Sequence, residues 1–214
     1  SVVYVELQAA SRIVAGGLCS FWIQNPFMPS PVAHTAIGYM IYQLSKSRLP
    51  QEGSKRVGPF SRSLVVTVGL SLLPDMDAVL GLLMGDLARF HNNVTNSLIV
   101  GLLVAPVVGG IAWMRQRSGF TRWLFIALLS YELHVMMDYL SVGRGLMLLW
   151  PLSWERYESP VKLFYGFRWS QPLMSVHHVW TLATELGFSA IIVLAAHIIT
   201  RRAISLPSRQ SPMP

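Results

Sequence analysis

Three apolar stretches limit what this chain can fold into more than any other feature of its sequence. Each is close to the roughly 20 apolar residues that a helix needs to cross a lipid bilayer; they are residues 98–114, 123–140 and 180–199. Shorter apolar stretches at 32–44 and 64–73 are expected to form half-spans or helices buried against the others, and 13–23 is a weaker candidate. Because the apolar residues do not alternate as they do in strands, we predict an all-α, membrane-embedded bundle of about five helices.

The composition favours a membrane protein over the other classes of protein. Only 13% of the residues are charged, which is about half of the roughly 25% found in an ordinary soluble domain. The 52% hydrophobic content excludes a disordered chain, and the single cysteine, Cys19, excludes a disulfide scaffold. A soluble all-α protein with an unusually apolar core is the alternative.

Most of the basic residues lie in alternate connections between the apolar stretches. The positive-inside rule places such connections in the cytoplasm, which predicts a multi-pass protein with cytoplasmic basic loops. The formal net charge of +7 then reflects topology, so we expect membrane lipids as partners and no nucleic acid. The residues concerned are Lys46, Arg48, Lys55, Arg56, Arg62, Arg115, Arg117, Arg122, Arg201, Arg202 and Arg209.

Most of the histidine and aspartate residues fall at the opposite ends of the same predicted helices. His134 and Asp138 stand out because both lie inside an apolar stretch, where ionisable groups are costly and usually face a bundle interior or a cavity. Residues four apart share a helix face, so the two could bind one metal ion, since imidazole nitrogen and carboxylate oxygen suit zinc. A purely structural His–Asp hydrogen bond would have the same spacing.

Two carboxylates follow a helix-breaking proline in Leu73-Pro74-Asp75-Met76-Asp77. At this spacing they do not share a helix face, but in a turn both can point at a common cation or bridge two. One of them could instead cap the next helix, which would leave the other unexplained. His34 opens the first predicted helix, where a lone histidine is more often solvated than a ligand, and His91 precedes the stretch at 98–114.

Taken in order, these elements resemble the YdjM-like family of bacterial and archaeal inner-membrane proteins, which are described as metal-dependent hydrolases. Members of that family show a histidine that opens an N-terminal helix, then Leu-Pro-Asp-x-Asp, His-Arg-Gly-x-Thr-His-Ser, His-x-x-x-Asp and Leu-Trp-Pro elements. The corresponding elements here are His34 and residues 73–77, 91–97, 134–138 and 149–151. Five ordered elements at plausible spacing are far more specific than any one of them.

The resemblance implies a metal site with zinc as the expected divalent ion, in an all-helical core reminiscent of zinc-dependent phospholipase C and P1-type nucleases. It implies a hydrolase that acts on phosphoester or lipid-linked substrates, with Asp75 and Asp77 as catalytic carboxylates, in a bacterial or archaeal inner membrane. The implied metal ligands are His34, Asp75, Asp77, His91, His134 and Asp138.

The third element departs from the family pattern. Asn92 and Asn93 stand where the family has Arg and Gly, and Asn96 stands in place of its second histidine. An asparagine oxygen is a much weaker zinc ligand than imidazole, which favours the alternative of a non-catalytic membrane scaffold or regulator with a degenerate metal site. A small transporter is a further alternative, with His134, Asp138 and Glu185 along its path; it is weakened because no inverted repeat is visible.

The chain divides into three parts on this interpretation. Residues 1–27 are expected to be either an N-terminal extension or an upstream translation of the true start, residues 28–200 the membrane-embedded hydrolase domain, and residues 201–214 a basic C-terminal tail. The segment 141–171, rich in Trp and Tyr, is expected either to lie on the membrane or to close over the pole that carries the histidines.

Overall fold

The computed structural model describes residues 27–28, 31–46, 56–57, 60–84, 93–168 and 175–205. The predicted all-α bundle is confirmed, while the stretch at 13–23 lies outside the described residues. The helices are α2 (Pro31–Ser45), α3 (Arg62–Leu72), the 3-10 helix η1 (Leu73–Asp75), α4 (Met76–Leu83), α6 (Leu98–Gln116), α7 (Phe120–Tyr139) and α8 (Val176–Ser205). α8 thus includes Arg201 and Arg202, the first residues of the expected tail.

Two short antiparallel strand pairs join segments next to the helices. β1 (Phe27–Met28) pairs with β4 (Phe167–Arg168), and β2 (Arg56–Val57) pairs with β3 (Phe60–Ser61). The first pair brings residues just before α2 next to residues before α8. The second is a hairpin that leads into α3.

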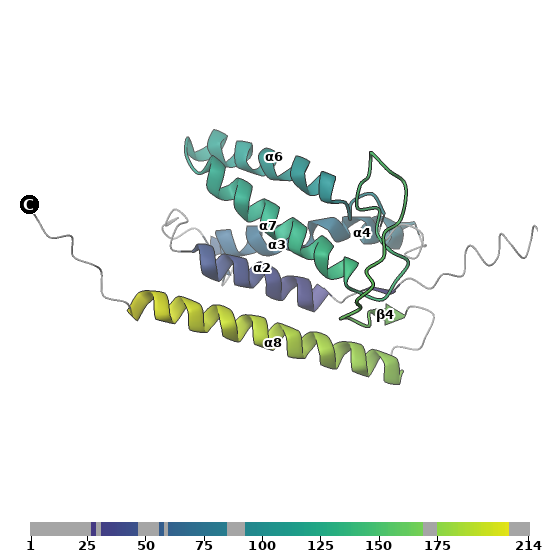
Figure 1. Ribbon diagram of the computed structural model, residues 1–214. Coiled ribbons are helices and arrows are strands. Elements are labelled where there is room, and N and C mark those ends of the chain that lie inside the picture. The colour runs from purple at the N-terminus through teal and green to yellow at the C-terminus, as the bar shows by residue number, and fades with distance from the viewer. Residues whose placement is uncertain are drawn as a thin grey trace, which may run out of the picture.

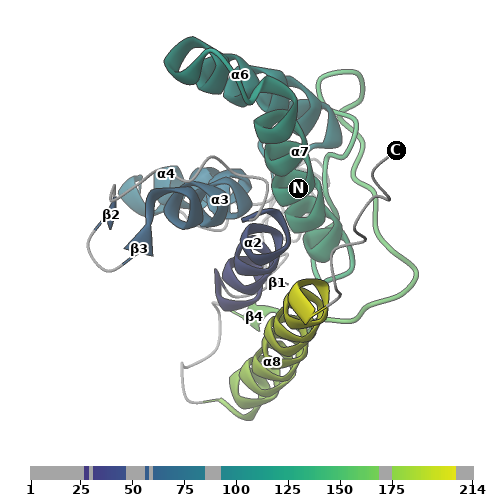
Figure 2. The ribbon, with the colours of Figure 1, turned by 90° about the vertical axis from the view of Figure 1, so that its left-hand side faces the viewer.

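α2 and α7 form the centre of the bundle. α2 packs against α3, α7 and α8, and α7 packs against α2, α3 and α6. Figures 1 and 2 show α6 and α8 on opposite sides of this central pair, with α3 and α4 beside it. The core between the helices is apolar and includes Ala33, Ile37, Leu70, Ile126 and Ala127.

Three helical stretches of the described chain are long and apolar enough to cross a membrane: Arg62–Gly81, Leu98–Arg115 and His178–Arg202. The first of these, Arg62–Gly81, is longer than the predicted apolar stretch at 64–73. Pro74 does end α3, but the chain continues through η1 into α4, which extends the apolar stretch beyond residues 64–73. The expected stretch at 123–140 forms the 20-residue helix α7 but is not among the three, because its inward face carries polar residues such as Ser130, His134 and Asp138.

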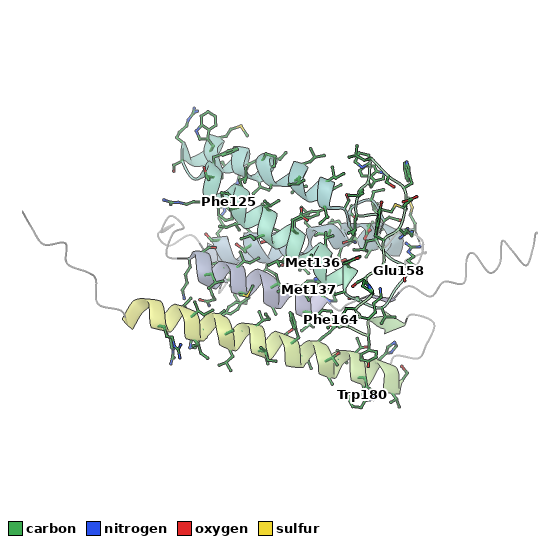
Figure 3. All side chains as sticks on the ribbon, in the orientation of Figure 1. Phe125, Met136, Met137, Glu158, Phe164 and Trp180 are labelled. Carbon is green, nitrogen blue, oxygen red and sulfur yellow. The ribbon has the colours of Figure 1, made fainter. Side chains whose placement is uncertain are left out.

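The outer faces of α6 and α8 are apolar and exposed. On α6 these residues include Leu102, Leu103 and Val107, and on α8 they include Leu186 and Ile191. Figure 3 shows Trp180, also on α8, pointing away from the bundle. Such extensive apolar surface is unfavourable in water, whereas the hydrocarbon core of a bilayer accommodates it.

The bundle has two chemically different ends. One end carries the α6–α7 turn and the C-terminal end of α8, with Arg115, Arg117, Arg122 and Arg202 (Figure 1). The other end carries the start of α6, the end of α7 and the long loop at 140–168, here called the polar-end loop. Asp75, His134 and Asp138 lie toward this second end of the described structure, and the cytoplasmic placement of the basic connections stays a prediction.

Candidate metal centre

A histidine from α2 and a histidine and an aspartate from α7 meet in the interior of the bundle. His34 Nε2 lies 3.2 Å from Asp138 Oδ1, and His134 Nε2 lies 3.5 Å from Asp138 Oδ2. The two imidazole rings stack, with centroids 3.7 Å apart. One ligand atom from each residue lies within 4.8 Å of the others, and all three residues are buried. This group could hold a metal ion.

The polar atoms of this group converge without forming hydrogen bonds. Both ring nitrogens of His34, Nε2 of His134 and both carboxylate oxygens of Asp138 are buried and make no hydrogen bond within the described part of the chain. The separations of 3.2–3.5 Å exceed the 2.7–2.9 Å of charge-assisted hydrogen bonds. A buried polar group is costly unless it is satisfied, and a cation between these atoms would give one atom of each of the three side chains a partner. The donor set therefore fits a divalent ion better than a closed hydrogen-bond cluster.

The backbone of α3 determines which nitrogen of His134 faces this group. His134 Nδ1 lies 2.6 Å from the carbonyl oxygen of Ser71, and because a carbonyl only accepts, Nδ1 carries the proton. In the neutral ring Nε2 then presents its lone pair toward the carboxylate of Asp138, an arrangement that a cation between them would stabilise. A metal-ligating histidine commonly has this arrangement, with its other nitrogen bonded to a carbonyl or carboxylate.

Ser71 holds the second histidine as well. Its hydroxyl donates to the backbone carbonyl of His34 at 3.0 Å and lies 2.8 Å from that of Val68. This contact needs a close approach of α2 to α3, which Gly38 permits: a Cβ at Gly38 would lie 2.8 Å from Val68 Cα. The two histidines are therefore positioned by the same residue of α3.

Asp75 lies at the edge of the group. Its Oδ1 is 3.3 Å from His134 Nε2, and 17% of its side chain is exposed, whereas His34, His134 and Asp138 have fully buried side chains. η1 places it there, because the 3-10 turn at Pro74 follows directly on α3. Asp75 is thus the carboxylate beside the group that water or a ligand can reach.

The other two predicted ligands are not in this group. Asp77 is buried, but its Oδ2 accepts the backbone amide of Asn93 at 3.1 Å, and it is not one of the three convergent residues. His91 lies outside the described residues. Of the six predicted ligands, the structure brings together His34, His134 and Asp138, with Asp75 adjacent.

Two outcomes depend on tertiary packing. His34 is fully buried, so the interpretation of a lone solvated histidine at a helix start is wrong; α2 packs against α3, α7 and α8. Ser71 was missed altogether. The only signal for it was a small polar residue four positions before Asp75 in an apolar stretch, which is too common to single out.

Comparison with known proteins finds similarity to inner membrane proteins. Residues 28–205 match the family model described as YdjM inner membrane protein. Inner membrane protein YbcI of Escherichia coli (strain K12) is 31% identical over 138 residues, which cover 62% of this chain and 73% of that protein. No solved structure matches the chain, so the likeness to zinc phospholipase C and P1-type nucleases stays a prediction. The match over 28–205 includes every residue of the candidate metal centre, and the chain belongs to the YdjM inner membrane protein family.

Proposed function

We propose that this protein is a membrane-embedded, metal-dependent hydrolase that acts on phosphoester or lipid-linked substrates. The observation that carries the proposal is the convergence of His34, His134 and Asp138 on one buried point without mutual hydrogen bonds. Two imidazoles and a carboxylate are a donor set that zinc prefers, and catalytic zinc sites use three protein ligands with one position left open. Zinc is therefore the proposed ion.

Each residue then has a distinct role. His34, His134 and Asp138 would hold the ion, and the carbonyl of Ser71 would keep His134 in the tautomer that leaves Nε2 available. A bound zinc would supply Lewis-acid activation of water and of a phosphoryl or acyl oxygen. Asp75, which is partly exposed beside His134, is placed to take a proton from the attacking water. Asp77 would have a supporting role, because its carboxylate accepts a hydrogen bond from the backbone amide of Asn93 and so holds the segment that begins there.

We infer that the end with the basic residues faces the cytoplasm, and that the metal centre lies toward the opposite surface of the inner membrane. The support is the gathering of basic residues at one end of the bundle, as the positive-inside rule requires. With Cys19 replaced by serine, single cysteines at Arg117 and Arg202 are expected to resist a membrane-impermeant maleimide added to spheroplasts, whereas one at Glu155 is labelled. All three positions are exposed on the protein, so labelling reports the side of the membrane. Labelling of only one of the two arginine positions would contradict the arrangement.

The activity is tested on the full chain purified in detergent. Metal-loaded protein is expected to hydrolyse bis-p-nitrophenyl phosphate, to lose this activity with EDTA and to regain it with zinc, because the ion activates the nucleophile. The reaction is followed by release of p-nitrophenol, with p-nitrophenyl butyrate as the carboxyl-ester comparison. Turnover of the butyrate alone would contradict a phosphoester substrate.

Two other outcomes identify the alternatives. Stoichiometric metal without turnover of either ester would favour a scaffold or regulator. The asparagine at position 96 also favours this alternative; its side chain is fully buried just before α6. Metal-dependent solute flux in proteoliposomes would favour a transporter. A preparation that binds no zinc, manganese or iron would overturn the metal site itself.

A further inference from the structure

The N-terminal third of α8 has an inverted distribution of polar and apolar side chains. Its polar residues His178, Thr181 and Glu185 are buried, whereas Val179 and Trp180 are 61% and 63% exposed. A protein surface in water has the opposite distribution, because buried ionisable groups are costly and exposed apolar patches are unfavourable there. The arrangement is the one expected of a helix that faces lipid on its outer side and protein on its inner side.

The exposed apolar residues of α8 indicate where the bilayer lies along this helix. They continue from Val179 to Ile199, within the stretch His178–Arg202 that is long and apolar enough to cross a membrane. At 1.5 Å per residue, the distance from Val179 to Ile199 is about 30 Å, which equals the thickness of the hydrocarbon core. One boundary of the hydrocarbon core therefore falls near Val179.

The polar-end loop contacts α8 beyond this boundary, on the membrane side. Phe164 is buried and packs edge-on against Phe188 of α8, with ring centroids 5.1 Å apart. Thr181 Oγ1 donates to Gly166 O at 2.9 Å, so the loop follows α8 over several turns. Phe188 lies about 14 Å further along the helix axis than Val179. Figure 1 shows the N-terminal part of α8 running past the end of α7, beside β4.

The backbone of the loop is hydrogen-bonded to the protein at this level. Leu163 N donates to Leu140 O at 2.7 Å, and Val142 N donates to Phe164 O at 2.9 Å. Non-helical backbone at membrane depth is tolerated only where the protein satisfies its polar groups. These bonds supply partners for the backbone on both sides of the Phe164 side chain, next to the end of α7.

The side chains that precede Phe164 are apolar and exposed. Val161 and Leu163 are 55% and 57% exposed, and Ser159 Oγ fixes the turn before them by accepting from Val161 N at 3.1 Å. Lys162 lies between them and is also exposed; its long aliphatic stem allows the ammonium to reach toward the lipid head groups. The segment therefore presents an apolar surface at a level of α8 that faces lipid.

We propose that residues 161–166 form a re-entrant segment, in which Val161 and Leu163 contact the acyl chains of membrane lipids. Acyl chains are favoured over a second copy of the chain because the Phe164–Phe188 contact makes this surface continuous with the lipid-facing side of α8. Since Leu163 is bonded to Leu140, the C-terminal end of α7 also lies below the membrane surface. The inference goes beyond the proposed function and depends on neither a metal ion nor hydrolysis.

The test is electron paramagnetic resonance of the full chain in vesicles of palmitoyl-oleoyl phosphatidylcholine, with Cys19 replaced by serine. Nitroxide labels are attached to single cysteines in Leu163→Cys and, separately, Val161→Cys. Collisions of each label with oxygen, which concentrates in hydrocarbon, are compared with collisions with chromium oxalate, which stays in water. The oxygen-to-chromium ratio at both positions should exceed the ratio in Glu155→Cys by at least about 10-fold, because a charged solute partitions poorly into hydrocarbon.

Glu155→Cys is the matched control, because Glu155 is an exposed residue of the same loop. Ile191→Cys gives the reference for lipid contact, since Ile191 is exposed in the middle of the apolar stretch of α8, and positions 161 and 163 should resemble it. The proposal is wrong if chromium oxalate collides with the labels at 161 and 163 as often as at 155, which would place the segment in water. It is also wrong if both reagents are excluded, which would show that protein covers the segment; spectral narrowing on dilution with unlabelled chain would then identify a second copy.

Discussion

Replacing Asp138 by asparagine is expected to weaken divalent-metal binding by at least about 100-fold, since even residues that only support a ligand typically cost 10–100-fold. The substitution keeps the size of the side chain and removes the only acidic member of the three convergent residues. His134→Ala should have the same effect, because it removes both the ligand nitrogen and the bond to Ser71 O. Metal per protein, measured by mass spectrometry of purified protein, checks both variants.

The melting temperature gives an independent measurement of the loss of metal binding. A ligand at about 1,000 times its Kd stabilises the folded state by about 4 kcal/mol, so zinc should raise the melting temperature of the wild-type protein and EDTA should lower it. Asp138→Asn should melt at the same temperature with and without zinc. His197→Ala is the control, because His197 is exposed on α8 and should keep both the metal and the shift. A full metal complement in Asp138→Asn would show that the metal does not bind at His34, His134 and Asp138.

Asp75→Asn is expected to keep the metal and to lower the turnover of the phosphoester substrate by about 10²–10⁴-fold, the usual contribution of a general base. Asp75 is the partly exposed carboxylate, 3.3 Å from His134 Nε2, so it can reach a water molecule that the buried Asp138 cannot. The kcat of metal-loaded protein on bis-p-nitrophenyl phosphate tests this expectation.

Asp77→Asn provides the comparison, because Asp77 is two residues away and bonds the amide of Asn93. An asparagine oxygen can accept the same hydrogen bond, so this variant should retain most of the activity. If Asp77→Asn loses as much turnover as Asp75→Asn, both carboxylates act at the reacting centre, as the family resemblance implied. If Asp75→Asn instead loses the metal, Asp75 is a ligand and the base lies elsewhere.

The membrane bundle and half of the metal centre were predictable from the sequence because both depend on local spacing. Long apolar stretches predicted the helices, and the four-residue separation of His134 and Asp138 placed them on one face of α7. The turn after Pro74 offered the carboxylates at 75 and 77 as cation ligands, and the family resemblance added His34. It did not distinguish Asp75, which lies beside His134, from Asp77, which contacts Asn93.

The sequence by itself determined which stretches of the chain are apolar enough to form membrane helices, since hydrophobic length is a property of the chain. Only the tertiary structure decided which helix faces meet. His34 joins residues about 100 positions away because Gly38 permits close contact between α2 and α3, and Ser71 then orients both histidines. Such contacts between distant segments depend on packing in three dimensions, which local periodicity does not encode.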